Sequence, residues 1–307
     1  MSRPVMSYRT YRKITFAAVL ALAVIVVSGA GVRLTGSGLG CTEWPKCTET
    51  QIHAPLRFHA MIEFGNRLFT GVVSVAVIAA VLGSLWLAPR RRDLTWWSLG
   101  LVAGVIAQIL LGAYTVMSEL TPQVVAAHFL VSMVLLWNAI VLHRRAAEPA
   151  GATRTVVAPK VRLLTHAVLL AASTVLFTGT IVTGTGPHGG DETSKRYDLS
   201  LSNVTRIHSV SAWALMALTL AVIWVGYRTR WPARARTTSH VLLWCIGVQG
   251  SIGYIQYAAG VPEWLVAFHI AGATAVFSAA VALWLACRES AATADAAGAE
   301  TPVHLSV

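Results

Sequence analysis

Long apolar runs, each of about 20 residues or more, dominate the chain and are separated by short polar segments. The runs cover residues 14–32, 60–88, 95–117, 123–142, 162–184, 203–227, 239–259 and 263–286. A helix of this length crosses the roughly 30 Å hydrocarbon core of a bilayer. The pattern therefore predicts an all-α polytopic membrane protein with eight transmembrane helices.

The composition agrees with this prediction. Of the 307 residues, 55% are hydrophobic and only 12% are charged, whereas a soluble domain carries about 25% charged residues. This excludes a disordered chain, a coiled coil and an ordinary soluble enzyme, and it makes membrane lipid the main surrounding medium.

The basic residues indicate the orientation of the spans. The net charge is +11, and 17 of the 24 Lys and Arg residues lie in the N-terminal tail, in the even-numbered connections or just after the last span. Because Lys and Arg favour the cytoplasmic side, we expect a multi-pass protein of the cell membrane with both termini in the cytoplasm. The excess of positive charge is then explained by the orientation of the spans in the membrane, and we expect no nucleic-acid partner.

The two halves of the chain resemble each other. Gly31, Thr35, Gly36 and Gly38 recur 148 positions later, and Gln108, Gly112 and His128 recur 141 positions later as Gln249, Gly253 and His269. An even number of spans in each half predicts a parallel repeat of two pseudo-symmetric four-helix bundles.

This repeat divides the chain into five segments. They are a cytoplasmic tail (1–13), an N-terminal four-helix half (14–143), a cytoplasmic linker (144–160), a C-terminal four-helix half (161–287) and a disordered cytoplasmic tail (288–307). For the second span, an offset of 149 pairs Arg57-Phe58-His59 with Arg206-Ile207-His208. We prefer an offset of 142, which pairs Asn66 with His208, because the spans that follow require 141.

Two histidines of the C-terminal half enter the membrane to the same depth. His208 lies about five residues into its span and His269 about six, so their depths agree within about 2 Å at 1.5 Å per residue. Each could be hydrogen-bonded to a neighbouring helix. Alternatively, the pair could hold a haem iron between two imidazoles, with an apolar pocket for the macrocycle. Zinc would need further ligands.

The N-terminal half keeps His128 but differs on its second span. Glu63, Asn66 and Arg67 lie on one helix face there. Glu63 and Arg67 could form an ion pair that only holds the bundle. An ionisable carboxylate near His128 instead suggests a reactive version of the haem site, with electron transfer in the other half.

Cys41 and Cys47 lie in the first outer loop, where the oxidising side of the membrane favours a disulfide. Such a bridge could pin the loop over the bundle, or it could exchange with an external thiol partner.

Taken together, these residues resemble the haem A synthase family of the cytochrome oxidase assembly pathway. The resemblance covers most of residues 14–287 and rests on the two four-helix halves, the glycines leading to the cysteine loop, Glu63 with Arg67, and three histidines: His128, His208 and His269. It implies haem b held by His208 and His269. It also implies substrate haem O in the other half, with His128 on the iron, Glu63 in catalysis, and Asn66 and Arg67 at the site. Asn66 departs from the family, which usually has a histidine there.

The family reaction implied by the resemblance oxidises the C8 methyl of haem O to a formyl group, with haem b as electron relay and the haem sites towards the outer face. Implied partners are haem O synthase, cytochrome oxidase assembly factors and membrane lipid, and a homo-oligomer is compatible with the sequence. The competing hypothesis is a membrane b-type cytochrome that only carries electrons. A small-molecule transporter has little support, because no span is broken at mid-membrane.

Overall fold

The computed structural model describes residues 5–229 and 231–290, and eight long helices account for most of them. The helices are α1 (Tyr8–Leu34), α2 (Phe58–Leu85), α3 (Arg92–Met117), α4 (Pro122–Ala146), α5 (Pro159–Thr185), α6 (Leu201–Arg228), α7 (Ala233–Ala258) and α8 (Glu263–Ala286). Each of the apolar runs coincides with one helix, so the all-helical prediction is confirmed.

The helices are suited to an apolar solvent. Seven of those in the described chain are long and apolar enough to cross a membrane. Large apolar side chains point outwards, among them Trp96 at 74% exposed and Leu163 and Trp244 at 71%, as expected where lipid covers the surface. The helix outside the seven is α7, whose first turns carry Arg234, Arg236 and a polar run to His240.

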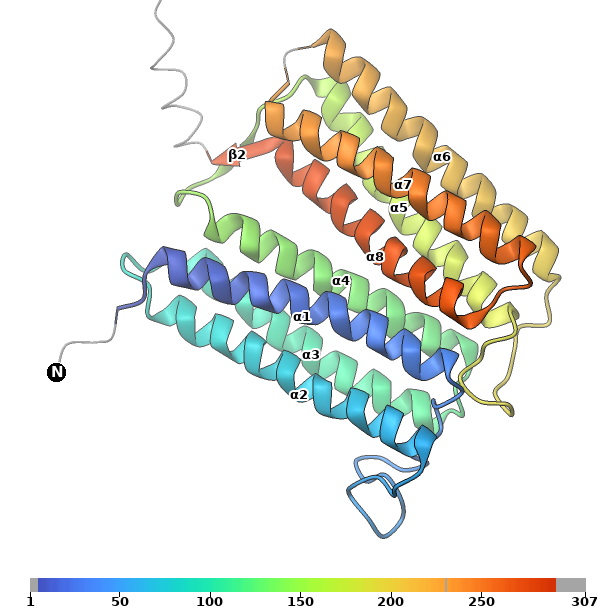
Figure 1. The fold of residues 1–307 in the computed structure, drawn as a ribbon. Coiled ribbons are helices and arrows are strands. Elements are labelled where there is room, and N and C mark those ends of the chain that lie inside the picture. The colour runs from blue at the N-terminus through green and yellow to red at the C-terminus, as the bar shows by residue number, and fades with distance from the viewer. Residues whose placement is uncertain (1–4, 230, 291–307) are drawn as a thin grey trace, which may run out of the picture.

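The helices form two groups that lie side by side (Figure 1). Helices α1–α4 pack on one another around one buried apolar cluster, and α5–α8 pack around another. The groups meet where α1 and α4 face α5 and α8. Val26 and Met133 of the first group belong to the core of the second, and Trp137 contacts Trp284 with ring centroids 6.4 Å apart. The two groups therefore share a continuous apolar interface.

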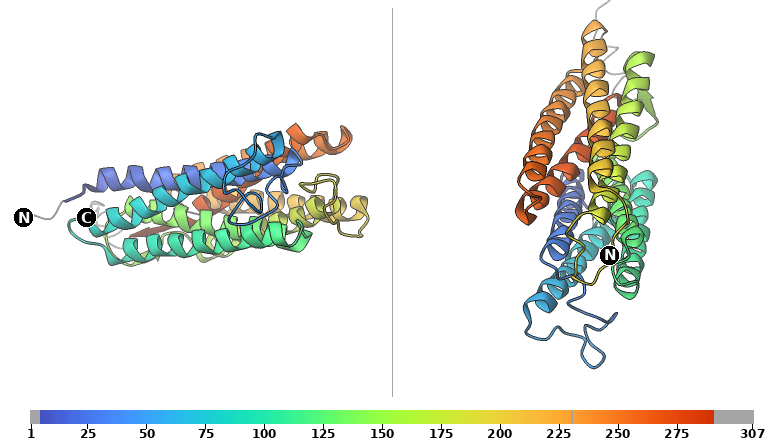
Figure 2. Two further views of the ribbon diagram at one scale, coloured as in Figure 1. Left: turned by 90° about the horizontal axis from the view of Figure 1, so that it is seen from below. Right: turned by 90° about the vertical axis from the view of Figure 1, so that its right-hand side faces the viewer.

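The two long loops, residues 35–57 and 186–200, lie at one end of the molecule (Figures 1 and 2). The start of α1 lies at the other end. This arrangement places the connections predicted as outer loops together and away from the first helix turn.

The C-terminal ends of α3 and α7 have the same backbone structure. Glu119 and Leu120 after α3 have left-handed backbones, with φ of 53° and 56°, as do Gly260 and Val261 after α7, with φ of 78° and 61°. The amide of Leu120 donates to the carbonyl of Thr115, and the amide of Val261 donates to that of Gln256. Both ends are thus Schellman caps, in which the left-handed residue is usually glycine.

The opposite end of the molecule corrects the prediction for the linker and tail. Strand β1 (Thr153–Thr155) lies in the linker and pairs antiparallel with β2 (Arg288–Ser290). The predicted disorder from residue 288 is therefore wrong for residues 288–290, and its remainder, 291–307, lies outside the described residues. A strand of three residues has too few alternating positions to give a sequence signal.

Glu119 is exposed and occupies the cap position that glycine fills after α7. We expect Glu119→Gly to stabilise the protein by about 1 kcal/mol, because it removes the steric cost of a left-handed backbone. Gly260→Ala should destabilise it by a similar amount. Thermal unfolding in detergent measures both, and a lower melting temperature for Glu119→Gly would contradict this assignment.

Candidate functional site

A cavity of about 1360 Å³ runs between the two helix groups, towards the end of the molecule where the two long loops lie. Pockets for single small ligands usually measure about 300–1,000 Å³, so this one has room for more than one such ligand. Glu63, Asn66, Arg67, His128, His208 and His269 all line it. The structure thus brings together the residues that the sequence marked in separate spans.

The second helix group contributes a pair of facing imidazoles. The rings of His208 and His269 have centroids 6.2 Å apart and are inclined at 72°. Nδ1 of His208 is 3.1 Å from the hydroxyl oxygen of Thr178, which fixes the ring and leaves Nε2 for another partner. Nδ1 of His269 is buried and has no hydrogen-bond partner within the described chain.

A glycine of a neighbouring helix lies next to each of the two imidazole rings. A Cβ atom at Gly179 would lie 3.2 Å from Cε1 of His208, and one at Gly253 would lie 3.0 Å from Cε1 of His269. These distances are tighter than ordinary van der Waals contact. The glycines therefore let each imidazole approach the neighbouring helix closely.

This geometry suits a metal held between two imidazoles. A metal bond to an imidazole nitrogen is about 2 Å long, so rings on opposite sides of one ion have centroids roughly 6 Å apart. Direct edge-to-face contact between rings falls in the same range. The buried Nδ1 without a partner favours the metal, since buried polar atoms normally find one. No group of three or more His, Cys, Asp or Glu side chains within residues 5–229 and 231–290 could hold a metal ion by itself.

The first helix group repeats part of this arrangement around His128. The side-chain amide of Gln108 donates to the His128 carbonyl at 3.1 Å, as that of Gln249 donates to the His269 carbonyl at 2.7 Å. Nδ1 of His128 is buried without a hydrogen-bond partner among the described residues. A Cβ atom at Gly112 would lie 3.5 Å from the His128 ring. The surroundings of His128 and His269 are therefore alike.

Asn66 occupies the place that His208 has in the other group. The Ser28 hydroxyl donates to Oδ1 of Asn66 at 2.7 Å, and Thr178 contacts His208 in the same way. These contacts favour the alignment of Asn66 with His208. They pair Ser28 with Thr178, an offset of 150. In the sequence, the glycines of α1 and α5 match at an offset of 148. The contacts of Ser28 and Thr178 match the two helices at 150 instead, because helix packing decides which residues face the neighbouring helix.

Glu63 and Arg67 form a clamp on the loop between α1 and α2. Glu63 is 6% exposed, and its Oε1 accepts from Arg67 at 2.5 Å and 3.1 Å. Its Oε2 accepts from the backbone amide of Cys41 at 2.7 Å. Arg67 also donates to the carbonyls of Glu43, Lys46 and Cys41. The ion pair that the sequence allowed is present, and it holds a loop in addition to the helix.

Cys41 and Cys47 form a disulfide within that loop, as predicted, and both are fully buried. Neither cysteine lines the cavity. The disulfide thus closes the loop beside Glu63. Through the hydrogen bonds of Glu63 and Arg67, this loop is connected to the cavity wall.

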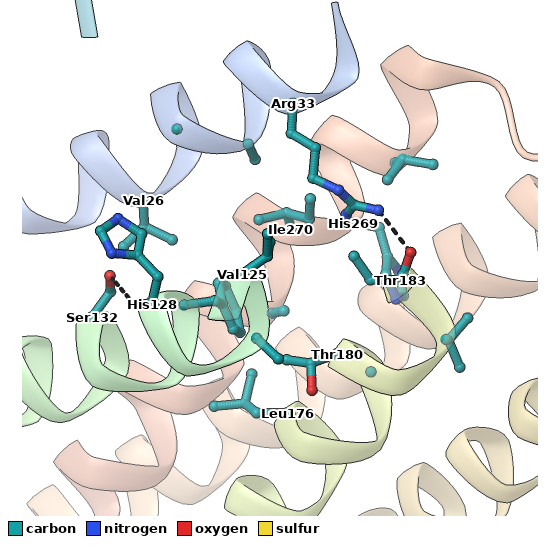
Figure 3. A pocket seen from close by; sticks show the side chains of 18 of the residues that line it. Val26, Arg33, Val125, His128, Ser132, Leu176, Thr180, Thr183, His269 and Ile270 are labelled. Carbon is teal, nitrogen blue, oxygen red and sulfur yellow. Dashed lines mark hydrogen bonds between the residues drawn. The ribbon is translucent and has the colours of Figure 1, made fainter. Parts of the chain in front are cut away.

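Figure 3 shows His128 on one side of the cavity and His269 on the other. Val125 and Ile270 lie between the two histidines in this view, and Val26 and Leu176 also line the cavity. Apolar side chains therefore line the cavity between the two histidines.

The structure also places in the cavity an arginine that the sequence pattern did not mark as a site residue. Arg33, at the end of α1, donates from Nη2 to the carbonyl of Thr183 on α5 at 2.7 Å (Figure 3). Arg33 directly follows the apolar run 14–32, and a charge at that position is the signal that could have marked it.

Comparison with known proteins identifies relatives. A family model described as cytochrome oxidase assembly protein matches residues 12–187. A protein of Lysinibacillus sphaericus named heme A synthase is 27% identical over 272 residues, which cover 83% of this chain and 86% of that protein. One of Listeria welshimeri with the same name is 26% identical over 273 residues, covering 85% and 90%. One of Geobacillus kaustophilus is 32% identical over 106 residues, covering 34% and 33%.

We expect Arg67→Ala to loosen the disulfide loop. It leaves the buried Glu63 carboxylate without its counter-ion, which should lower the free energy of unfolding by about 3 kcal/mol. The rate at which a mild thiol reductant opens the Cys41–Cys47 disulfide should rise, as measured by maleimide labelling. Arg57→Ala, at an exposed position of the same outer side, is the control. Equal reduction rates in both variants would contradict the clamp.

Proposed function

The chain belongs to the family of cytochrome oxidase assembly proteins, and we propose that it is a haem A synthase, an integral membrane oxidoreductase that converts haem O to haem A. The observation that carries the proposal is one cavity with two unequal sites: a histidine pair in one helix group, and His128 with a carboxylate in the other. Relatives with this name align over more than four fifths of the chain.

The proposed architecture is eight membrane spans in two parallel, pseudo-symmetric four-helix bundles. It is supported by the caps after α3 and α7 and by the matching Gln108 and Gln249 hydrogen bonds, which share an offset of 141. With the positive charges on the cytoplasmic side, both termini lie in the cytoplasm and the cavity opens towards the outer face. α7 would be the least apolar span.

In the C-terminal half, His208 and His269 would hold haem b by its iron. Bound there, haem b supplies one-electron transfer. Thr178 orients the His208 ring, and Gln249 holds the backbone that carries His269. Gly179 and Gly253 leave space for the rings to lie against their neighbouring helices.

In the N-terminal half, His128 would bind the iron of substrate haem O from one side. Asn66 would contact the same substrate without being an iron ligand, because an amide whose oxygen accepts from Ser28 is a poor substitute for imidazole. Arg67 holds Glu63 at the cavity wall. The apolar lining excludes water from the reacting methyl group.

The proposed reaction converts a methyl group and one water molecule into a formyl group, with release of four protons and four electrons, and the electrons would leave through the haem b site to an electron acceptor outside the protein. Glu63 is the acidic side chain of the described cavity lining, so we assign it the catalytic role of accepting protons as the methyl group is oxidised. Its Oε atoms would do so from a position fixed by Cys41 and Arg67.

The histidine pair by itself also fits a membrane b-type cytochrome that only carries electrons. The two functions differ in the pigments of the purified protein: the electron carrier holds haem b and does not turn over haem O. As a haem A synthase, the protein would receive haem O from haem O synthase in the membrane and deliver haem A to cytochrome oxidase assembly factors, as a monomer or a homo-oligomer.

Glu63→Gln tests the enzymatic proposal. The amide keeps the shape and an oxygen for the Cys41 amide but accepts no proton, so haem O conversion in membranes should fall at least ~100-fold. Glu49→Gln, at an exposed position of the same loop, is the matched control. Extracted haems are separated and quantified by mass. Conversion at the wild-type rate in Glu63→Gln would sink the catalytic role.

His208→Ala and His269→Ala test the assignment of the halves. Each should abolish the low-spin haem absorbance of the purified protein, because one axial ligand is lost. His128→Ala should keep that absorbance and lose haem A formation. The opposite pattern, with the absorbance lost only in His128→Ala, would exchange the roles of the two halves.

A further inference from the structure

Basic side chains without acidic partners line the outer part of the cavity. Arg33, Lys195, Arg196 and Arg206 all face it, and none of them forms an ion pair with a carboxylate in the part of the chain that the structure describes. The remaining basic residue of the lining, Arg67, is the partner of Glu63. The cavity thus contains an excess of positive charge at its outer end.

Two of these residues come from different helix groups and lie beside the same loop. Arg33 ends α1 and reaches α5, where it donates to the Thr183 carbonyl at 2.7 Å. Arg196, in the loop between α5 and α6, donates from Nη2 to the Pro187 carbonyl at 2.6 Å. A Cβ atom at Gly190 would lie 3.5 Å from Cγ of Arg33, and one at the neighbouring Gly189 would collide with the Arg196 guanidinium, so both arginines lie beside this loop. A shared anion would relieve the repulsion between two cations placed there.

Most of the hydrogen-bonding capacity of these arginines is unused. A guanidinium has five N–H donors in a planar fork, and Arg33 and Arg196 each donate one hydrogen bond within the described chain. Burial lowers the pKa of Arg196 from its usual value, because desolvation disfavours the charged form. Both arginines are partly withdrawn from water, which favours an anionic partner, and the fork matches a carboxylate.

The loop is shaped around Arg196. A side chain at Gly189 would collide with the Arg196 guanidinium and with the Ser194 hydroxyl, and Gly189 is buried. The amide of Gly38 donates to the Gly190 carbonyl at 2.7 Å, which ties this loop to the chain just after Arg33. Both arginines are therefore held in place by the backbone around them.

The position of the pair points to one ligand. Arg33 and His269 lie on the same side of the cavity in Figure 3, and Arg206 precedes His208 by two residues. We propose that Arg33 and Arg196 form a carboxylate-binding site for the propionate groups of the haem held by His208 and His269. This inference rests on the proposed function. It means that the first helix group completes the haem site of the second.

The test uses the full-length protein purified in detergent, with variants Arg33→Gln, Arg196→Gln and Arg33→Lys, and with Arg57→Gln as an exposed control. The measurements are haem per protein, the midpoint potential of the low-spin haem, and the affinity for added haem O. Size-exclusion profiles and the Cys41–Cys47 disulfide report correct folding.

We expect Arg33→Gln and Arg196→Gln each to lower the haem content and to lower the midpoint potential. A nearby positive charge stabilises the reduced iron relative to the oxidised iron. A tenfold weakening of this stabilisation lowers the midpoint potential by about 59 mV for a one-electron couple. Arg33→Lys should keep the potential nearer the wild-type value while losing haem, because it keeps the charge but not the fork. Arg57→Gln should change neither quantity.

Three outcomes would overturn the inference. If the wild-type protein holds the haem and both glutamine variants keep the same haem content and midpoint potential, this inference is overturned while the proposed function stands. A loss confined to haem O affinity would assign the arginines to the substrate's propionates instead. A wild-type protein without a bis-histidine haem would overturn the proposed function and this inference with it.

Discussion

Polar groups inside this protein depend on neighbouring helices, because a lipid surrounding offers them no hydrogen bonds. Gln108 and Gln249 each donate to the backbone that carries a cavity histidine, and Ser28 and Thr178 each hold the side chain facing it. Buried polar atoms without such partners are few in the described chain, and His128 and His269 supply two of them. The dependence on internal partners is what makes these two nitrogens informative.

The two helix groups share one framework, which in our proposal serves different chemistry in each. Both place a histidine against a glycine and a glutamine, so both can present an imidazole to a bulky planar ligand. The groups differ opposite that histidine, where one has His208 and the other has Asn66 and Glu63. In our proposal a symmetric pair favours stable iron ligation and electron transfer, whereas the unequal pair leaves one face of the substrate open to reaction.

Neither group is complete without the rest of the chain. Arg33 crosses from α1 to α5, and Val26 and Met133 enter the core of the second group. The first outer loop reaches Glu63 through Cys41 and Arg67, so a disulfide outside the cavity positions a carboxylate at its wall. The shared interface explains why the cavity is continuous between the two halves.

The sequence determined the helices, because burial in lipid requires long apolar runs that are visible without any tertiary contact. It also identified His128, His208, His269 and Glu63, since ionisable residues are rare in such runs. Tertiary structure decided what these residues contact: the clamp on Glu63, the reach of Arg33, and the α1 register marked by Ser28. Each residue turns a helix by about 100°, from 3.6 residues per turn. The partner of a side chain thus depends on packing that a single sequence does not encode locally.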